Sequence, residues 1–264
     1  MLSYYVAGEP QAPMIALVHG VCDSATAWVD LINRLQSDYF VVAFDSLGHG
    51  TSRRFTEEEL ADPGSATARE LEATLEHLRD LYGNTPVIIA HSMGAAVSSL
   101  LSIRRPDLVC GLFLEDPAWL SDEQAAGYRE RAEEQVRIST QLWQSDPATT
   151  VAQNAELRPT WDAASHIGWA FGKALVDSHL LATGIVSFLQ PWREVAAQIS
   201  VPTMVVTSDT DEVLIGEAGV HAIEELRNEH IETAIIPGTG HGVRLSKPDE
   251  YSAVLDQWLE RFAK

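Results

Sequence analysis

Short apolar runs alternate along the chain with stretches in which apolar residues recur at helical spacing. The runs predict buried strands at Met14–Val18, Tyr39–Phe44, Pro86–Ala90, Val109–Leu114, Pro202–Thr207 and Ile231–Ile236. Apolar positions three and four residues apart predict helices around Trp28–Leu35, Leu71–Tyr82, Ala95–Ile103, Ala218–Leu226 and Tyr251–Phe262. Strands that alternate with helices are typical of a parallel sheet covered by helices on both faces. We therefore predict an α/β fold whose mostly parallel sheet is sandwiched by helices.

The alternation stops in the middle of the chain. Between residues 117 and 195 the pattern predicts helical segments and no strand, and five of the seven tryptophans lie there: Trp119, Trp143, Trp161, Trp169 and Trp192. Such a stretch is longer than an ordinary connection between elements. We predict a helical cap at 117–195, inserted between the two parts of an α/β core at 1–116 and 196–264.

The net negative charge of the chain disfavours some classes of binding partner. Its 264 residues include 18 Lys+Arg and 38 Asp+Glu, a formal net charge of −20. Such a field repels nucleic-acid backbones and acidic membrane surfaces. It also disfavours anionic substrates unless a local basic pocket overrides it, and the sequence contains no Lys/Arg cluster. We expect a small-molecule substrate, with neither nucleic acid nor membrane as a partner; the oligomeric state stays open.

The N-terminal segment and the cysteines predict a cytoplasmic protein. Residues 1–13 lack both the charged and the apolar part of a signal peptide. No apolar run reaches the length needed to span a bilayer. Cys22 and Cys110 are too few for a disulfide framework, which fits a reducing compartment.

The segment Ala90-His91-Ser92-Met93-Gly94 joins a predicted buried strand to a helix of small residues. A sharp turn from strand to helix brings the two backbones together, so the residues two positions before and after its tip must be small. The helix N-terminus behind the tip offers free N–H groups to a developing oxyanion. We therefore predict Ser92 as a nucleophile. The alternative is a turn of small residues without chemistry.

A serine hydroxyl needs a base within hydrogen-bond reach, and the base needs an orienting carboxylate. Asp211 follows one of the later predicted strands, and His241 follows the next strand between two glycines. The carboxyl ends of parallel strands meet at one edge of a sheet. Ser92, Asp211 and His241 are therefore expected to converge there, in the chain order Ser, Asp, His.

Other carboxylates compete for the acid position. Asp209 lies two residues before Asp211, and Glu115 and Asp116 follow an earlier strand. Asp116 is otherwise explained as a turn former before a proline. Asp45 is a rival for the nucleophile rather than for the acid, but its segment is turn-rich and no helix follows it, so we expect it to tie a loop.

These motifs together resemble the α/β-hydrolase fold superfamily over essentially the whole chain. The matching segments are His19-Gly20, Asp45-Ser46-Leu47-Gly48-His49-Gly50-Thr51-Ser52, Ala90-His91-Ser92-Met93-Gly94 and Gly240-His241. They resemble, in that order, the oxyanion loop, the D-x-x-G-x-G-x-S segment, the G-H-S-M-G nucleophile elbow and the terminal G-H of the family. Ala90 and Ala95 depart from the family pattern, but both stay small.

The resemblance implies Ser92 as nucleophile, His241 as base and Asp211 as acid. It also implies that the backbone N–H groups of Val21 and Met93 stabilise the oxyanion.

The remaining candidates have simpler roles. We expect Cys22 and Trp119 to line the pocket, and His19 and His91 to brace the loops beside Ser92. The spacing of His and Cys residues predicts no metal site. No G-x-x-x-x-G-K-[ST] or G-x-G-x-x-G segment occurs, so no cofactor is expected.

The sequence therefore predicts a cofactor-free serine hydrolase that cleaves a neutral, fairly apolar carboxylic ester or lactone through an acyl-enzyme on Ser92. One alternative is a carbon–carbon bond hydrolase that uses the same triad on a β-diketone or ring-cleavage product. Such an enzyme would need cationic or polar residues in the pocket to bind a carboxylate. A more remote alternative is a non-catalytic ligand receptor on the same fold.

Overall fold

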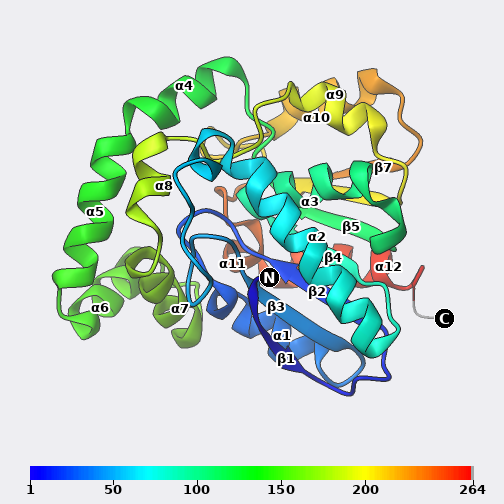
Figure 1. The fold of residues 1–264 in the computed structure, drawn as a ribbon, viewed down its shortest axis with the longest axis horizontal. Coiled ribbons are helices and arrows are strands. Elements are labelled where there is room, and N and C mark those ends of the chain that lie inside the picture. The colour runs from blue at the N-terminus through cyan, green and yellow to red at the C-terminus, as the bar shows by residue number, and fades with distance from the viewer. Residues whose placement is uncertain (263–264) are drawn as a thin grey trace.

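The computed structural model describes residues 1–262. Within them a seven-stranded sheet has the order β1-β3-β2-β4-β5-β6-β7 (Figure 1). Its strands are β1 (Ser3–Ala7), β2 (Met14–Val18), β3 (Phe40–Asp45), β4 (Val87–His91), β5 (Gly111–Glu115), β6 (Thr203–Thr207) and β7 (Ile231–Ile235). Neighbouring strands are parallel except β1 and β3. This confirms the predicted α/β fold with a mostly parallel sheet.

The edge strand β1 is absent from the sequence prediction. It pairs antiparallel with β3, with Ser3 opposite Asp45. Tyr5 and Val6 are both half exposed. An edge strand with a solvated face needs no continuous apolar run, so the pattern that reveals the buried parallel strands is missing here.

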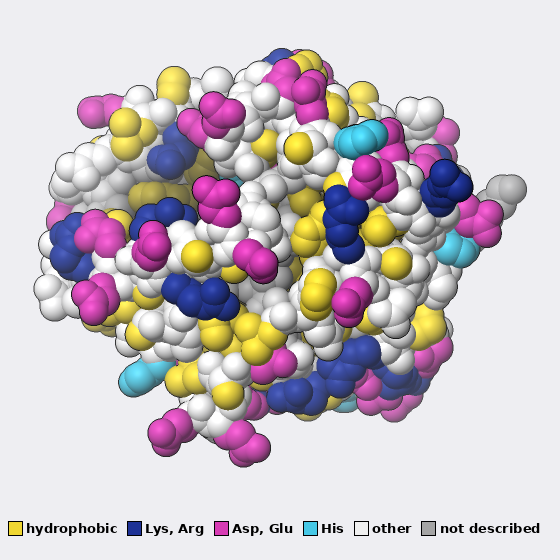
Figure 2. Space-filling view, turned by 90° about the horizontal axis from the view of Figure 1, so that it is seen from above, with side chains coloured by type: hydrophobic (Ala, Val, Ile, Leu, Met, Phe, Trp, Pro, Cys, Tyr) yellow, Lys and Arg dark blue, Asp and Glu magenta, His cyan; other side chains and the backbone are white. Residues whose placement is uncertain are grey.

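Helices α4 (Asp122–Glu130), α5 (Ala132–Gln144), α6 (Pro147–Leu157), α7 (Ala163–Ala174) and α8 (Ser178–Thr183) stand to one side of the sheet (Figure 1). We refer to these five as the cap helices. In the described chain no strand lies between residues 117 and 195. Figure 2 shows acidic side chains spread over the face seen from above, and a hollow over the cap helices edged by Lys and Arg.

Two layers of helices cover the sheet. Helices α1 (Val29–Leu35) and α12 (Pro248–Leu259) pack on one face. The other face carries α2 (Pro63–Tyr82), α3 (Ser92–Arg104), α9 (Trp192–Gln198) and α10 (Gly216–Leu226). Thus α9 packs with the sheet layer, although it lies inside the stretch assigned to the cap from sequence. The short helix α11 (Val243–Ser246) precedes α12.

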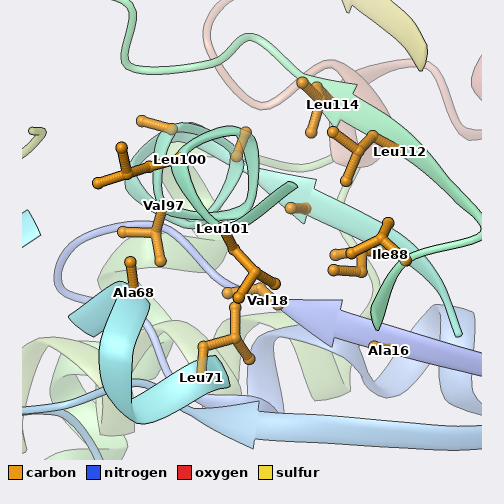
Figure 3. Close-up of a cluster of buried hydrophobic side chains, with 14 of the residues drawn as sticks. Ala16, Val18, Ala68, Leu71, Ile88, Val97, Leu100, Leu101, Leu112 and Leu114 are labelled. Atoms are coloured by element: carbon orange, nitrogen blue, oxygen red, sulfur yellow. The ribbon is translucent and has the colours of Figure 1, made fainter. Parts of the chain in front are cut away.

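The core explains why the strands are apolar throughout. In β2, Ala16 and Val18 belong to the cluster beneath α2 and α3, whereas Ile15 and Leu17 belong to the cluster beneath α1 and α12. Figure 3 shows part of the first cluster, in which Leu101 of α3 points toward Val18 of β2. Because both faces are buried, successive residues of each central strand are apolar. The carboxyl ends of these strands are thereby held in fixed register.

No helix in residues 1–262 combines the length and the apolar character that crossing a bilayer requires.

Candidate active site

Ser92 occupies a strained turn between β4 and α3. Its φ is +52°, in the left-handed region that non-glycine residues rarely adopt. A Cβ on Gly94 would lie 2.3 Å from the carbonyl oxygen of Val18, so only glycine allows this helix start to approach β2. Ala90, two residues before the tip, is fully buried. The backbone therefore has the strand–turn–helix form expected of a nucleophile elbow.

The loop after β2 packs directly against this elbow. A Cβ on Gly20 would lie 3.1 Å from the Cβ of Ser92 and 2.9 Å from Nδ1 of His91. The next residue, Val21, lines the same cavity as Ser92. Met93 is in the first turn of α3, where backbone N–H groups have no partner within the helix. The two N–H donors predicted from sequence therefore lie in segments that adjoin Ser92.

His241 is oriented by Asp116. Nδ1 of His241 lies 2.6 Å from Oδ2 of Asp116. Because an ionised carboxylate only accepts hydrogen bonds, Nδ1 carries the proton and Nε2 is left free to accept one. His241 and Ser92 line one cavity. This is the arrangement in which an imidazole can take a proton from a serine hydroxyl.

Asp116 is itself fixed by further donors. Its Oδ1 accepts from the hydroxyl of Thr207 at 2.8 Å and from the N–H of Ile215 at 3.1 Å, and its Oδ2 accepts from the N–H of Leu214 at 2.8 Å. Asp116 is fully buried and has a positive φ of 37°. Several hydrogen bonds to the charged form compensate for its burial.

The structure does not bring Asp211 to His241, contrary to the sequence prediction. Asp211 is exposed, and the described part of the chain provides its carboxylate with no hydrogen bond. The neighbouring Asp209 accepts from the N–H of Gly238 at 2.7 Å and so ties two loops together. Asp116, an alternative left open from sequence, is the carboxylate that pairs with His241.

Strand order explains this correction. β5 lies between β4 and β6, and His91 at the end of β4 is in register with Glu115 at the end of β5. Ser92 and Asp116 are the next residues along the chain, so they lie side by side at this edge of the sheet. The loop that contains Asp211 supplies the backbone donors Leu214 and Ile215 to Asp116. The sequence feature that could have identified Asp116 is its position directly after β5, the strand that follows α3.

Histidines and a carboxylate brace the surrounding loops. Nε2 of His19 accepts from the N–H of Ser46 at 2.9 Å, and Nε2 of His91 lies 3.1 Å from the carbonyl oxygen of His241. Burial lowers the pKa of His91 well below its ordinary value, and the charges around it lower it further. Asp45 accepts from the N–H groups of Ala25 and Thr51, each at 2.8 Å. These contacts agree with the bracing and loop-tying roles expected from sequence.

The cavity around Ser92 has a volume of about 720 Å³ and lies between the sheet edge and the cap helices. Cys22 is part of its lining, as predicted. Trp119 is not, and the sequence prediction fails there. Its indole is buried, donates to Oγ of Ser99 at 3.2 Å and stacks on Trp192 with ring centroids 5.4 Å apart. The aromatic rings that line the cavity come from Tyr128, Trp161 and Trp169.

A buried ion cluster, missed from sequence, also lines the sheet side of the cavity. Oε1 of Glu115 accepts from the backbone N–H of Arg244 at 2.8 Å. The guanidinium of Arg244 pairs with Asp30 and lies 4.5 Å from the ring centroid of Trp28. Burial raises the pKa of Glu115 to about 7, although Arg244 acts in the opposite direction. Among residues 1–262, no three His, Cys, Asp or Glu side chains gather as metal ligands would.

Comparisons with known proteins place the chain in a family. The model of the alpha/beta hydrolase family matches residues 15–254, so the chain belongs to this family. A probable esterase of Oryza sativa subsp. japonica is 27% identical over 256 residues, covering 95% of this chain and 92% of the relative.

Solved structures show the same fold. E-2-(acetamidomethylene)succinate hydrolase superposes with a TM-score of 0.80 at 19% identity, covering 98% of this chain and 95% of that one. The enol-lactonase from Burkholderia xenovorans superposes with a TM-score of 0.76 at 18% identity, covering 98% and 96%.

Proposed function

We propose that the protein is a cofactor-free serine hydrolase that cleaves a carboxylic ester or lactone. The observation that carries the proposal is the Asp116–His241 pair, at 2.6 Å, in the cavity that also contains Ser92 at its strained turn. Membership of a hydrolase family and the similarity to a probable esterase support it. An ester or lactone carbonyl is the electrophile that such a serine attacks.

In the proposed reaction Oγ of Ser92 attacks the carbonyl carbon while its proton passes to Nε2 of His241. Asp116 holds the imidazole and stabilises its charged form. The N–H groups of Val21 and Met93 stabilise the oxyanion, each donor typically contributing about 3 kcal/mol to lowering the barrier. His241 then protonates the leaving alkoxide. Water, deprotonated by His241, attacks the acyl-enzyme, and His241 returns that proton to Oγ of Ser92 as the acid is released.

A fluorophosphonate probe tests this proposal without a substrate. We expect mass spectrometry to locate one adduct on Ser92, absent in Ser92→Ala and strongly reduced in His241→Ala. Ser145→Ala removes an exposed serine at the end of α5 and should label like the wild type. Folded protein that remains unlabelled would overturn the proposal and favour a ligand receptor.

Carbon–carbon bond hydrolysis by the same residues is a second candidate. It is favoured by the cationic side chains in the cavity, since a ring-cleavage product carries a carboxylate. Turnover of a β-diketone with little turnover of aryl esters would select this candidate over ester hydrolysis.

A further inference from the structure

The cap side of the cavity contains two cations that the sequence analysis did not place there. Arg158 follows the last residue of α6, and Lys173 lies in the last turn of α7. Both line the cavity that contains Ser92. In the described chain neither forms an ion pair with Asp or Glu, whereas Arg244 on the sheet side pairs with Asp30. Their charges are therefore available to a ligand.

Arg158 is held in place by buried polar groups. Its guanidinium donates to Oδ1 of Asn154, and Nδ2 of Asn154 donates to Nδ1 of His166 at 2.9 Å. Asn154 and His166 are both buried. The guanidinium lies 5.1 Å from the ring centroid of Trp161, which in turn stacks on His166. An arginine fixed in this way loses little conformational entropy when it binds an anion.

Lys173 lies beside the loop that contains Val21. Its Nζ is 3.5 Å from the carbonyl oxygen of Cys22. A Cβ on Gly172 would lie 2.6 Å from Cα of Asp23, so α7 packs tightly against this loop. The ammonium group therefore lies where α7 meets the loop after β2, in the cavity that contains Ser92.

The two cations share one aromatic ring. The guanidinium carbon of Arg158 lies 5.5 Å, and Nζ of Lys173 5.7 Å, from the ring centroid of Trp169. Contact with an indole face orients a cation without neutralising its charge. Three carboxylates also line the cavity: Asp23, Glu115 and Glu212. Glu115 accepts from Arg244, Glu212 is exposed, and Asp23 forms no ion pair within residues 1–262.

We propose that Arg158 and Lys173 bind a carboxylate of the substrate, so that the preferred substrate is an ester or lactone that also carries a free carboxylate. This rests on the proposed serine hydrolase function. It differs from the expectation of a neutral, fairly apolar substrate, which rested on the net charge of −20 and the tryptophans of the predicted cap. A local basic pair, assembled by folding, overrides the repulsive field of the whole chain.

The test compares the mono-4-nitrophenyl esters of succinic, glutaric and adipic acid with the same esters methylated at the free carboxyl, after subtraction of spontaneous hydrolysis. We expect wild-type kcat/KM to favour the charged member of at least one pair by about 10-fold or more. Arg158→Gln and Lys173→Gln should each lower that preference toward equal turnover of the two esters, mainly through KM. Arg137→Gln, which removes an exposed cap arginine bonded to Glu134, should keep it.

Binding to Ser92→Ala separates the two proposals. We expect monomethyl glutarate to bind this variant, detected by calorimetry, and to lose affinity when Arg158→Gln or Lys173→Gln is added. Equal turnover of charged and methylated esters, without such binding, would overturn the carboxylate site and leave the hydrolase proposal standing. Binding that depends on both cations, without turnover of any ester, would sustain the site and refute the hydrolase function.

Discussion

On the sheet side of the cavity, Ser92 and Asp116 each directly follow the end of a strand, and His241 follows soon after β7. On the cap side, Arg158 and Lys173 are placed by contacts between side chains of different helices. Backbone hydrogen bonds across the sheet fix the first set through strand register. The second set depends on how Trp161, Trp169 and Asn154 pack.

The two sets of residues have different proposed roles: those at the strand ends carry out the reaction, and those on the cap helices select the substrate. Residues at strand ends keep their relative positions when loops and helices change, because the sheet is buried on both faces. Of the cap helices, α7 packs against the loop after β2, whereas the strand ends are held by the sheet itself. If the proposed function is correct, the sheet side holds the nucleophile and base, and the cap helices supply the contacts that distinguish one substrate from another.

The largest expected effect tests the acid position on the sheet side. Asp116→Asn should lower kcat on 4-nitrophenyl acetate about 10⁴-fold, because the amide no longer stabilises the imidazolium and favours the wrong tautomer. Asp211→Asn is the matched control and should stay within about 2-fold of the wild type. Circular dichroism should show that both variants are folded. A loss in Asp211→Asn equal to that in Asp116→Asn would restore Asp211 as the acid.

A second prediction concerns the buried Glu115 beside the same strand end. Its pKa of about 7 in the folded chain lies above the ordinary value of 4.5, so the folded state holds a proton that the unfolded chain releases between those pH values. The free energy of unfolding contributed by this group therefore falls as pH rises from about 4.5 to 7 and is constant above that. Gln at position 115 does not titrate.

Urea unfolding at several pH values measures this effect. The free energy of unfolding of the wild type, minus that of Glu115→Gln, should fall by on the order of 3 kcal/mol as pH rises from 4.5 to 8. Glu123→Gln replaces an exposed carboxyl of α4 and should follow the wild-type curve. If the curves of Glu115→Gln and the wild type run parallel, Glu115 is ionised throughout this range.

The sequence was sufficient for most of the sheet side. Apolar runs located six of the seven strands, and the small residues around Ser92 and the glycines around His241 marked two loops that line the same cavity. Asp116 was misread because an aspartate before a proline is also an ordinary turn former. Choosing between Asp116 and Asp211 requires knowing that β5 lies between β4 and β6, which is a property of the assembled sheet.

The cap side could not be predicted in the same way. Helical periodicity reveals which face of a helix is apolar, but not against which neighbour it packs or how the helices cross. Arg158 follows α6 and Lys173 lies near the end of α7, so the two cations do not form a cluster that is visible in the sequence. Trp119 lies next to the sheet edge in sequence, yet its ring turns away from the cavity to stack on Trp192.

The smallest expected effect on activity tests this last difference with two tryptophans. Trp119→Phe removes a hydrogen bond to Ser99 and part of a buried ring, so it should lower the free energy of unfolding by about 1 to 3 kcal/mol. KM and kcat should stay within about 2-fold, since the ring does not line the cavity. Trp161→Phe, which changes a ring in the cavity lining beneath Arg158, should change KM more than stability.

Steady-state kinetics on aryl esters and urea unfolding, carried out on both variants, distinguish the two positions. A rise in KM for Trp119→Phe, at a temperature where the variant is fully folded, would mean that the cavity extends past Ser99 toward α9 when substrate binds. The set of residues that line the cavity would then differ between the free and the substrate-bound protein. Equal KM values for Trp119→Phe and the wild type would mean that substrate does not contact this ring, because Trp119 stays bonded to Ser99 and stacked on Trp192 when substrate binds.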